Sequence, residues 1–134
     1  ADVTLRGRDD WKTPLHIASE MWNVQLIEYL LQNGAKICLN DPDKNGSPPI
    51  TLACMGGSRT AVAALLNFGA IIDAGDMVMS FPPLHACALL GNMNLVVYLI
   101  QRGASVNYKD FSGFTPLHHA VIICGNTFII LSIY

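Results

Sequence analysis

The side chains best suited to catalysis or metal binding in this sequence are four histidines and four cysteines. A Cys–His nucleophile needs a base and an orienting group in one pocket, and the sequence contains no pattern that would assemble them. The cysteines include no Cys-x-x-Cys pair, and their spacing differs from that of zinc sites. His119 directly follows His118, and adjacent helix positions do not face one another. The sequence therefore predicts no metal, no cofactor and no enzymatic activity.

The cysteines are better explained as structural residues. Their even number allows a disulfide framework, but three of the four fall inside helical phrases, where a small apolar side chain serves well. We expect free, buried thiols in a reducing compartment, with disulfides as the alternative. The four residues are Cys38, Cys54, Cys87 and Cys124. The glycine-rich stretch Gly56-Gly57-Ser58 lacks the Lys-Ser/Thr of a phosphate-binding loop.

Three of the histidines occupy the fourth position of a phrase that is written four times along the chain. The phrase occurs as Thr13-Pro14-Leu15-His16, Pro48-Pro49-Ile50-Thr51, Pro82-Pro83-Leu84-His85 and Thr115-Pro116-Leu117-His118. Its second proline recurs every 33–35 residues, and a Gly-Ala dipeptide keeps the same period. Self-similarity at this period indicates a stacked array, which works mainly through an extended surface.

Each unit of the array has the pattern of two antiparallel helices. In the third unit, Pro83 suits the first helical turn, where its missing N–H has no partner to lose. Gly91-Asn92 ends that helix and reverses the chain, and Gly103 ends the next one. The second helix carries one apolar stripe, made of Leu95, Val96, Leu99 and Ile100. Neither helix can bury its stripe alone, so the predicted fold class is an all-α solenoid of helix-turn-helix units joined by hairpin-like loops.

The composition excludes several other classes of protein. Of the 134 residues, 51% are hydrophobic and 13% are charged, so the chain has ample apolar surface to bury and is not expected to be disordered. The net charge is −2, and the eight Lys and Arg residues form no basic stripe, so we expect no nucleic-acid partner. The N-terminus lacks the apolar core of a signal peptide, and the interrupted apolar tail 121–134 is too short to span a membrane.

The repeated unit resembles the ankyrin repeat. The segments Thr13-Pro14-Leu15-His16-Ile17-Ala18 and Thr115-Pro116-Leu117-His118-His119-Ala120 match the family's Thr-Pro-Leu-His-x-Ala opening in full. The segment from Gly103 to Asp110 is similar to the family's linking hairpin, and the resemblance covers essentially the whole chain. It implies that the repeated histidine hydrogen-bonds the backbone near a turn, and that the protein binds other proteins.

The resemblance also divides the chain. We expect a trailing hairpin of a preceding repeat at 1–12, ankyrin repeats at 13–46, 47–80 and 81–113, and a partial repeat at 114–134, as in a fragment of a longer array. Two features depart from the family pattern. Pro48 and Pro82 replace the threonine that would cap the first helix, at a cost of ~1 kcal/mol. Asp10-Trp11-Lys12 and Met79-Ser80-Phe81 stand where a turn glycine is expected, so we expect these two turns to differ from the family shape.

The family's partners usually lie against the hairpin tips and the exposed face of the first helices. Carried over to this chain, those positions predict a partner-binding row made of Trp11, Lys12, Lys44, Met55, Met77, Met79, Phe81, Leu89, Leu90, Phe111 and Phe114. Neighbouring positions of the same row are Glu20, Met21, Asp43, Asn45, Val78 and Ile122. Much of the row is apolar, which is typical of interface cores. The alternative is that several of these side chains tuck under a neighbouring turn.

Two functions remain open at this point. The first is a scaffold in the cytoplasm, or in the nucleus, that binds a partner protein on its concave face. The second is a regulatory or substrate-recruiting segment of a larger enzyme, channel or ubiquitin-ligase adaptor. The resemblance also implies a modification site, because Leu99, Asn107 and Asp110 have the spacing of ankyrin hairpins whose asparagine is hydroxylated. A plain turn asparagine that hydrogen-bonds its own backbone is the alternative for Asn107.

Overall fold

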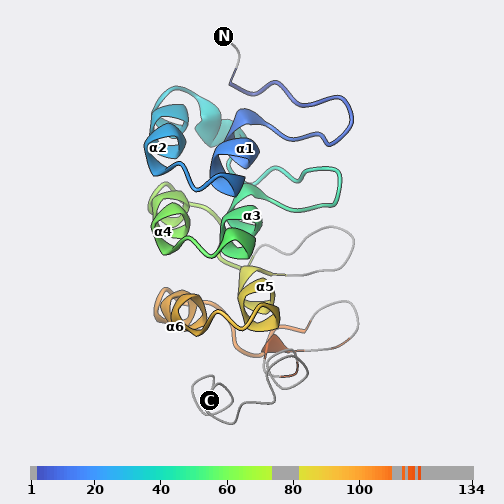
Figure 1. The fold of residues 1–134 in the computed structure, drawn as a ribbon, viewed down its shortest axis with the longest axis vertical. Coiled ribbons are helices and arrows are strands. Elements are labelled where there is room, and N and C mark those ends of the chain that lie inside the picture. Colours follow the sequence, from blue (N-terminus) through green and yellow to red (C-terminus); the bar gives the residue numbers. More distant parts are fainter. Residues whose placement is uncertain (1–2, 74–81, 110–112, 114, 117, 119–134) are drawn as a thin grey trace.

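The computed structural model describes residues 3–73, 82–109, 113, 115, 116 and 118. This part of the chain contains six α-helices, one short 3₁₀ helix and no strand. The elements are α1 (Pro14–Glu20), α2 (Val24–Gln32), η1 (Ala35–Cys38), α3 (Pro49–Gly56), α4 (Arg59–Asn67), α5 (Pro83–Leu89) and α6 (Met93–Gln101). Helices α1, α3 and α5 stack in one layer and α2, α4 and α6 in a second, with the loops 3–13 and 39–48 projecting beside the first layer (Figure 1). The predicted all-α solenoid is therefore confirmed.

The helix starts follow the residues that precede them. Thr13 forms a capping box with His16, in which the Thr13 side chain accepts from the His16 amide and the His16 ring accepts from the Thr13 amide. Helices α3 and α5 begin at proline and have no side-chain cap, as expected from Pro48 and Pro82. The second helices are capped by polar side chains at their first turns, namely Asn23, Ser58 and Asn92.

The core runs along the stack as one continuous cluster. Helix α1 packs on α3, α3 packs on α5, and α2 packs on α4, so each unit is buried mainly against its neighbours. The largest fully buried apolar side chains are Leu15, Ile27, Ile50, Leu65, Leu84, Leu95 and Leu99. Hydrogen bonds also link positions that lie about one repeat apart. The Lys44 amide donates to the Asp10 carbonyl, and the Ser105 amide donates to the Asp73 carboxylate.

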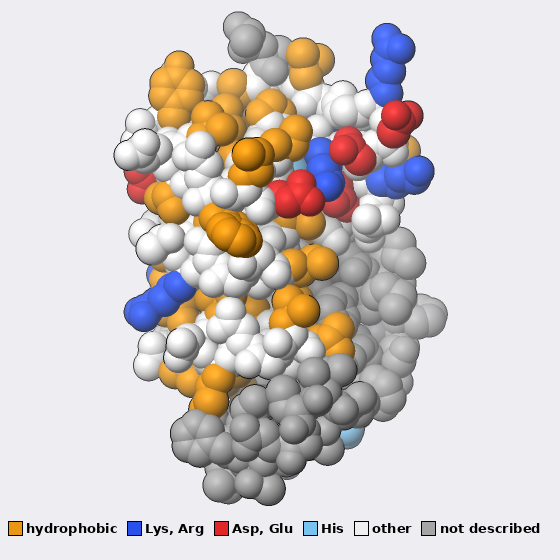
Figure 2. Space-filling view, in the orientation of Figure 1, with side chains coloured by type: hydrophobic (Ala, Val, Ile, Leu, Met, Phe, Trp, Pro, Cys, Tyr) orange, Lys and Arg blue, Asp and Glu red, His pale blue; other side chains and the backbone are white. Residues whose placement is uncertain are grey.

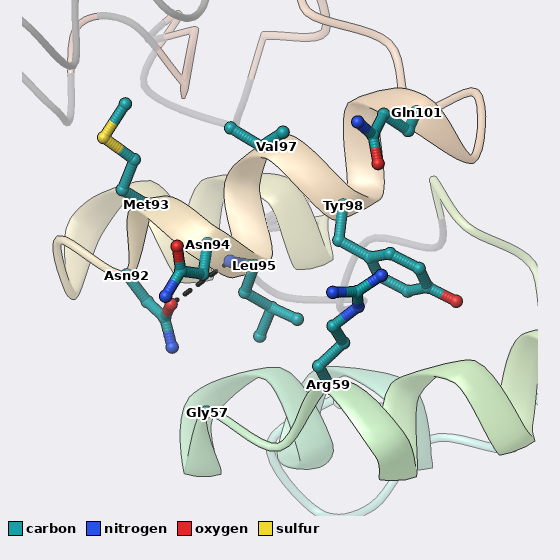
Figure 3. Close-up of a pocket in the computed structure, with 9 residues that line it drawn as sticks. All are labelled: Gly57, Arg59, Asn92, Met93, Asn94, Leu95, Val97, Tyr98 and Gln101. Carbon is teal, nitrogen blue, oxygen red and sulfur yellow. Dashed lines mark hydrogen bonds between the residues drawn. The ribbon is translucent and has the colours of Figure 1, made fainter.

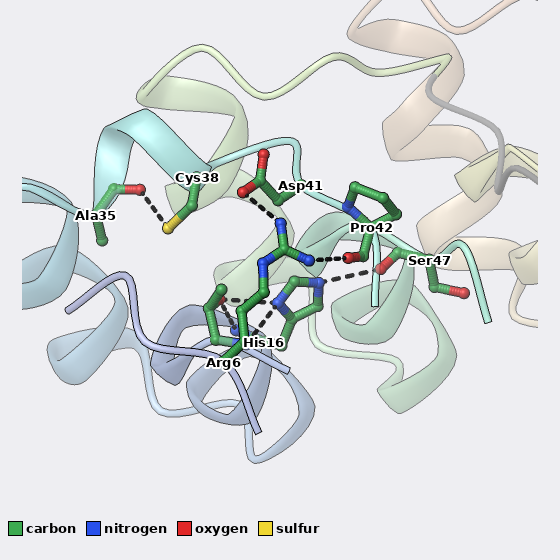
Figure 4. A network of polar contacts seen from close by, with 8 residues as sticks. Arg6, His16, Ala35, Cys38, Asp41, Pro42 and Ser47 are labelled. Atoms are coloured by element: carbon green, nitrogen blue, oxygen red, sulfur yellow. Dashed lines mark hydrogen bonds and ion pairs between the residues drawn. The ribbon is translucent and has the colours of Figure 1, made fainter. Parts of the chain in front are cut away.

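The repeated histidine of the first unit is a structural residue, as the resemblance implies. His16 is fully buried, and its Nε2 lies 3.1 Å from the Ser47 carbonyl oxygen of the next loop (Figure 4). Because its Nδ1 accepts from the Thr13 amide, Nε2 carries the proton and donates to Ser47. Burial lowers the pKa of His16, partly offset by the bond to Ser47. Beside it, Arg6 pairs with Asp41 at 2.8 Å.

The cysteines that the structure describes are free and buried, as expected, namely Cys38, Cys54 and Cys87. Burial raises the pKa of the Cys38 thiol, and burial together with the Cys87 thiol raises the pKa of Cys54 well above its usual value. Cys124 lies outside the described residues. Within the described ranges, no cluster of His, Cys, Asp or Glu side chains could hold a metal ion, and no helix is long and apolar enough to cross a bilayer.

Candidate functional site

Exposed apolar side chains form a row across the carboxyl ends of the first helices. The row consists of Met21, Trp22, Met55 and Leu90, which are 68%, 54%, 56% and 57% exposed. Figure 2 shows hydrophobic side chains at intervals down this face, whereas acidic and basic ones gather over the N-terminal hairpin. We call these four residues the apolar row. Large apolar side chains exposed together are typical of protein-binding surfaces.

A small pocket lies next to the row, between α3 and α5. Its volume is about 240 Å³, roughly the size of a large side chain, and it includes Met55 and Leu90 of the apolar row. The other lining residues are Asn45, Ser47, Thr51, Ala86 and Leu89. The structure thus brings together Met55, Leu89 and Leu90, three residues of the predicted partner-binding row.

One of the residues that line this pocket, Thr51, has a buried hydroxyl. Thr51 is only 2% exposed, and its Oγ1 has no hydrogen-bond partner among the described residues. Thr51 holds the position that His16 holds in the first unit, where the longer imidazole reaches the loop carbonyl of Ser47. An unpaired buried hydroxyl costs on the order of 1–3 kcal/mol, so a group that hydrogen-bonds to it would recover part of that cost.

Trp22 has an unusual backbone conformation for its residue type. Its φ is 59°, in the left-handed region that favours glycine. The other two units have glycine at this turn, Gly57 with φ 80° and Gly91 with φ 72°. Sequence reasoning missed Trp22, although aligning the turns of the three units would have singled it out. Such strain is often found where a side chain serves a function.

The indole of Trp22 also joins the first unit to the second. It lies so close to Gly56, the last residue of α3, that a Cβ built at Gly56 would stand 1.7 Å from the indole Nε1. Gly56 follows Met55 directly, and Met55 shares the pocket with Leu90. Trp22 thus packs against the end of α3, and the pocket joins that end of α3 to the end of α5.

Trp11 repeats the same feature at the tip of the N-terminal hairpin. It is 55% exposed with φ 58°, where the corresponding loops have Gly46 with φ 84° and Gly113 with φ 83°. The turn keeps the backbone conformation of a glycine turn despite the missing glycine, so the expected change of shape was wrong at this residue. Both tryptophans of the chain are therefore exposed and occupy strained positions.

The remaining predicted residues differ in their exposure. Lys12 is tied to Glu20, with its Nζ 3.1 Å from the carboxylate, and Lys44 is exposed. Asp43, a neighbouring position of the predicted row, is 3% exposed, and its carboxylate accepts hydrogen bonds from the amides of Asn45 and Ser47. These hydrogen bonds from the Asp43 side chain to backbone amides stabilise the turn. Outside the described residues lie Met77, Val78, Met79, Phe81, Phe111, Phe114 and Ile122.

The predicted modification site is accessible. Asn107 is exposed in a turn after α6, and its side-chain amide makes no hydrogen bond with another described residue. Hydroxylation of Asn107 stays a prediction.

The comparisons with known proteins agree with this architecture. Residues 2–76 match a family described as ankyrin repeats in three copies, and residues 84–132 match one described as ankyrin repeats in many copies. The first match covers more than half of the chain, and the helix pairs, capping box and period all fit. The chain belongs to the ankyrin repeat family.

Two curated proteins are similar over about half of the chain. A 62-residue segment, 46% of the chain, is 37% identical to the 26S proteasome non-ATPase regulatory subunit 10 of Dictyostelium discoideum and covers 26% of that protein. Over an alignment of 69 residues, which covers 48% of the chain, it is 36% identical to the IkB-like protein of African swine fever virus (strain Badajoz 1971 Vero-adapted), of which the match covers 28%. The match spans about a quarter of the length of each of these relatives.

Proposed function

We propose that this chain is a scaffold that binds a partner protein on its concave face, with the apolar row as the centre of the interface. Ankyrin repeats are protein-interaction modules, and the chain belongs to that family. The choice of surface rests on the exposure of Trp22, Met55 and Leu90 at the ends of three stacked helices, and on the pocket that Met55 and Leu90 line together. Tryptophan is enriched among the residues that dominate binding energy at interfaces.

The pocket between α3 and α5 supports a specific binding mode. Its size suits one apolar side chain of the partner, which would pack against Met55, Leu89 and Leu90. A hydrogen-bond acceptor on that side chain or on its backbone would accept a hydrogen bond from the Thr51 hydroxyl. The proposal assigns no catalytic step to this chain, and it requires no cofactor, metal or nucleic acid.

The test is quantitative affinity capture with variants of the chain. Met55→Asp combined with Leu90→Asp places charges in the apolar row, and we expect proteins captured by the unmodified chain to be lost. The matched control is Ile37→Asp, because Ile37 is an exposed apolar residue, 82% exposed, on η1 away from the row. Circular dichroism checks that all variants stay folded. Equal capture by the row variant and the unmodified chain would contradict the proposal.

The second candidate is that the same surface serves inside a larger enzyme, channel or ubiquitin-ligase adaptor, as a regulatory or substrate-recruiting segment. It is supported by the relatives, which extend well beyond the matched segments and include a regulatory subunit of the proteasome. The complete coding sequence distinguishes the two, because a catalytic or membrane domain in the same protein would favour the second.

We also propose that the chain resides in the cytoplasm or the nucleus, and that Asn107 is hydroxylated. Three free, buried thiols support the cytoplasm or the nucleus, where thiols stay reduced. The exposed turn position of Asn107 supports its hydroxylation. Microscopy of a fluorescent fusion tests the first, and peptide mass spectrometry after incubation with an asparagine hydroxylase tests the second.

A further inference from the structure

A groove lies on the other helix layer, lined by residues of α4 and α6. Helix α2 packs on α4, whereas α4 and α6 make few contacts, and a groove of about 910 Å³ opens between them. Figure 3 shows Arg59 reaching across the groove from α4 to Tyr98 of α6. The groove is also lined by Gly57, Asn92, Met93, Asn94, Leu95, Val97 and Gln101.

Two guanidinium groups contact the ring of Tyr98: Arg59 lines the groove, whereas Arg102 does not line it and lies beside it at the Tyr98 hydroxyl. The Arg59 guanidinium lies 4.6 Å from the centroid of the Tyr98 ring, and that of Arg102 lies 5.7 Å from it. Arg102 also donates to the Tyr98 hydroxyl at 2.6 Å and to the Asn67 side-chain oxygen at 3.3 Å. Cation–π contact and these hydrogen bonds restrict both side chains before any ligand binds, which lowers the entropy cost of binding.

No carboxylate in the described part of the chain pairs with the positive charge at the groove. Arg6 and Lys12 are neutralised by Asp41 and Glu20, whereas Arg59 and Arg102 form no ion pair with any described carboxylate. The first turns of α4 and α6 also border the groove and add partial positive charge. A guanidinium presents a planar fork of donors that matches a carboxylate.

From this geometry we infer that the groove between α4 and α6 binds an acidic segment of a partner protein, whose carboxylates pair with Arg59 and Arg102. The Tyr98 ring, which points toward Arg59 (Figure 3), gives the segment an apolar contact, and Asn94 offers its amide to the backbone of the segment. Nucleic acid fits poorly, because two arginines neutralise few phosphates and the whole chain carries a net charge of −2. This inference does not rest on the apolar row, which lies across the ends of the other helix layer.

The experiment is a fluorescence anisotropy titration of the 134-residue chain with a labelled peptide of alternating glutamate and alanine. The matched probe is the same peptide with glutamine in place of glutamate. We expect the acidic peptide to bind and the glutamine peptide to bind at least about tenfold more weakly, because a guanidinium pairs with a carboxylate and not with an amide. Equal binding of the two peptides, or no binding of the acidic one, would overturn the inference.

Variants locate the binding. Arg59→Gln should weaken binding of the acidic peptide roughly three- to tenfold. Tyr98→Ala should weaken it to a similar extent, because both arginines lose their contact with the ring. Tyr98→Phe keeps the ring and should change the affinity less than about twofold. Arg8→Gln is the control, because Arg8 is exposed on the N-terminal hairpin and this substitution removes the same charge as Arg59→Gln. An equal loss in Arg8→Gln and Arg59→Gln would show unspecific attraction and overturn the assignment.

A charge reversal keeps the test valid if a variant loses stability. Arg59→Glu should lose the acidic peptide and gain affinity for a peptide of alternating lysine and alanine, a gain that a partly unfolded chain would not produce. Oligonucleotides and vesicles of anionic lipid serve as competing probes. If either binds in an Arg59-dependent way more tightly than the acidic peptide, the proposed occupant is wrong.

Discussion

At the scale of single residues, the two tryptophans are the least expected feature of the molecule. Each occupies a turn position at which other units have glycine, and each keeps the left-handed backbone that glycine adopts there. The strain costs on the order of 1 kcal/mol at each position. Because Trp22 lies exposed within the apolar row, we expect the cost of this strain to be offset when its side chain contacts a partner.

Replacing Trp22 with glycine separates the two roles of this residue. The variant Trp22→Gly relieves the backbone strain and loses the packing over Gly56, so we expect the free energy of unfolding to change by less than about 1 kcal/mol. Partner binding should weaken by about 2 kcal/mol or more if Trp22 is an anchor. Chemical denaturation and an affinity measurement on the captured partner provide the two numbers. A large loss of stability with unchanged affinity would make Trp22 a purely structural residue.

A second residue-scale prediction concerns pH. Burial lowers the pKa of His16 in the folded chain below its ordinary value of 6.5. As the pH falls through about 6.5, the unfolded chain therefore takes up a proton more readily than the folded one, and the free energy of unfolding should decrease by up to about 1.4 kcal/mol per pH unit. Denaturation curves between about pH 7.5 and 5.5 measure this slope. The slope should be smaller in His16→Gln, and an identical slope in both chains would disprove the role of His16.

At the scale of the elements, most of the fold could be predicted from the sequence. The repeated prolines and Gly-Ala dipeptides mark helix starts and ends, and the missing caps of α3 and α5 follow from Pro48 and Pro82. The two hollows could not be predicted in the same way. The groove depends on how closely α6 packs against α4, and the pocket depends on how far the Thr51 side chain reaches. Both are results of packing and not of the local sequence pattern.

The capping box of α1 provides a prediction at this scale. Thr13 is fully buried and bonds both the His16 amide and the His16 ring. The variant Thr13→Ala should therefore lower the free energy of unfolding by about 1–2 kcal/mol. The control is Gln25→Ala, at an exposed position of α2, with an expected change within about 0.5 kcal/mol. Equal effects of the two substitutions, measured by urea denaturation, would contradict this account of the helix start.

At the scale of the whole molecule, the two helix layers present surfaces of different chemistry. The first layer carries the apolar row and a side-chain-sized pocket, and the second carries a groove lined by Arg59, whose guanidinium lies over the Tyr98 ring. A stacked array suits this division, because each layer is continuous along the chain and contributes its own face. The part of the surface that the sequence predicted includes Met55, Leu89 and Leu90, whereas Trp22 and the arginine groove emerged from the structure.

The central claim is that the partner protein contacts the apolar row, and site-specific photo-crosslinking tests it most directly. A photoreactive amino acid is placed at Met55 of the unmodified chain, and at Ile37 as the control, and adducts are identified by mass spectrometry. The account predicts a defined protein adduct from position 55 that disappears when Leu90→Asp is added, and none of the same protein from position 37. An adduct of that protein from position 37 with none from position 55 would contradict it.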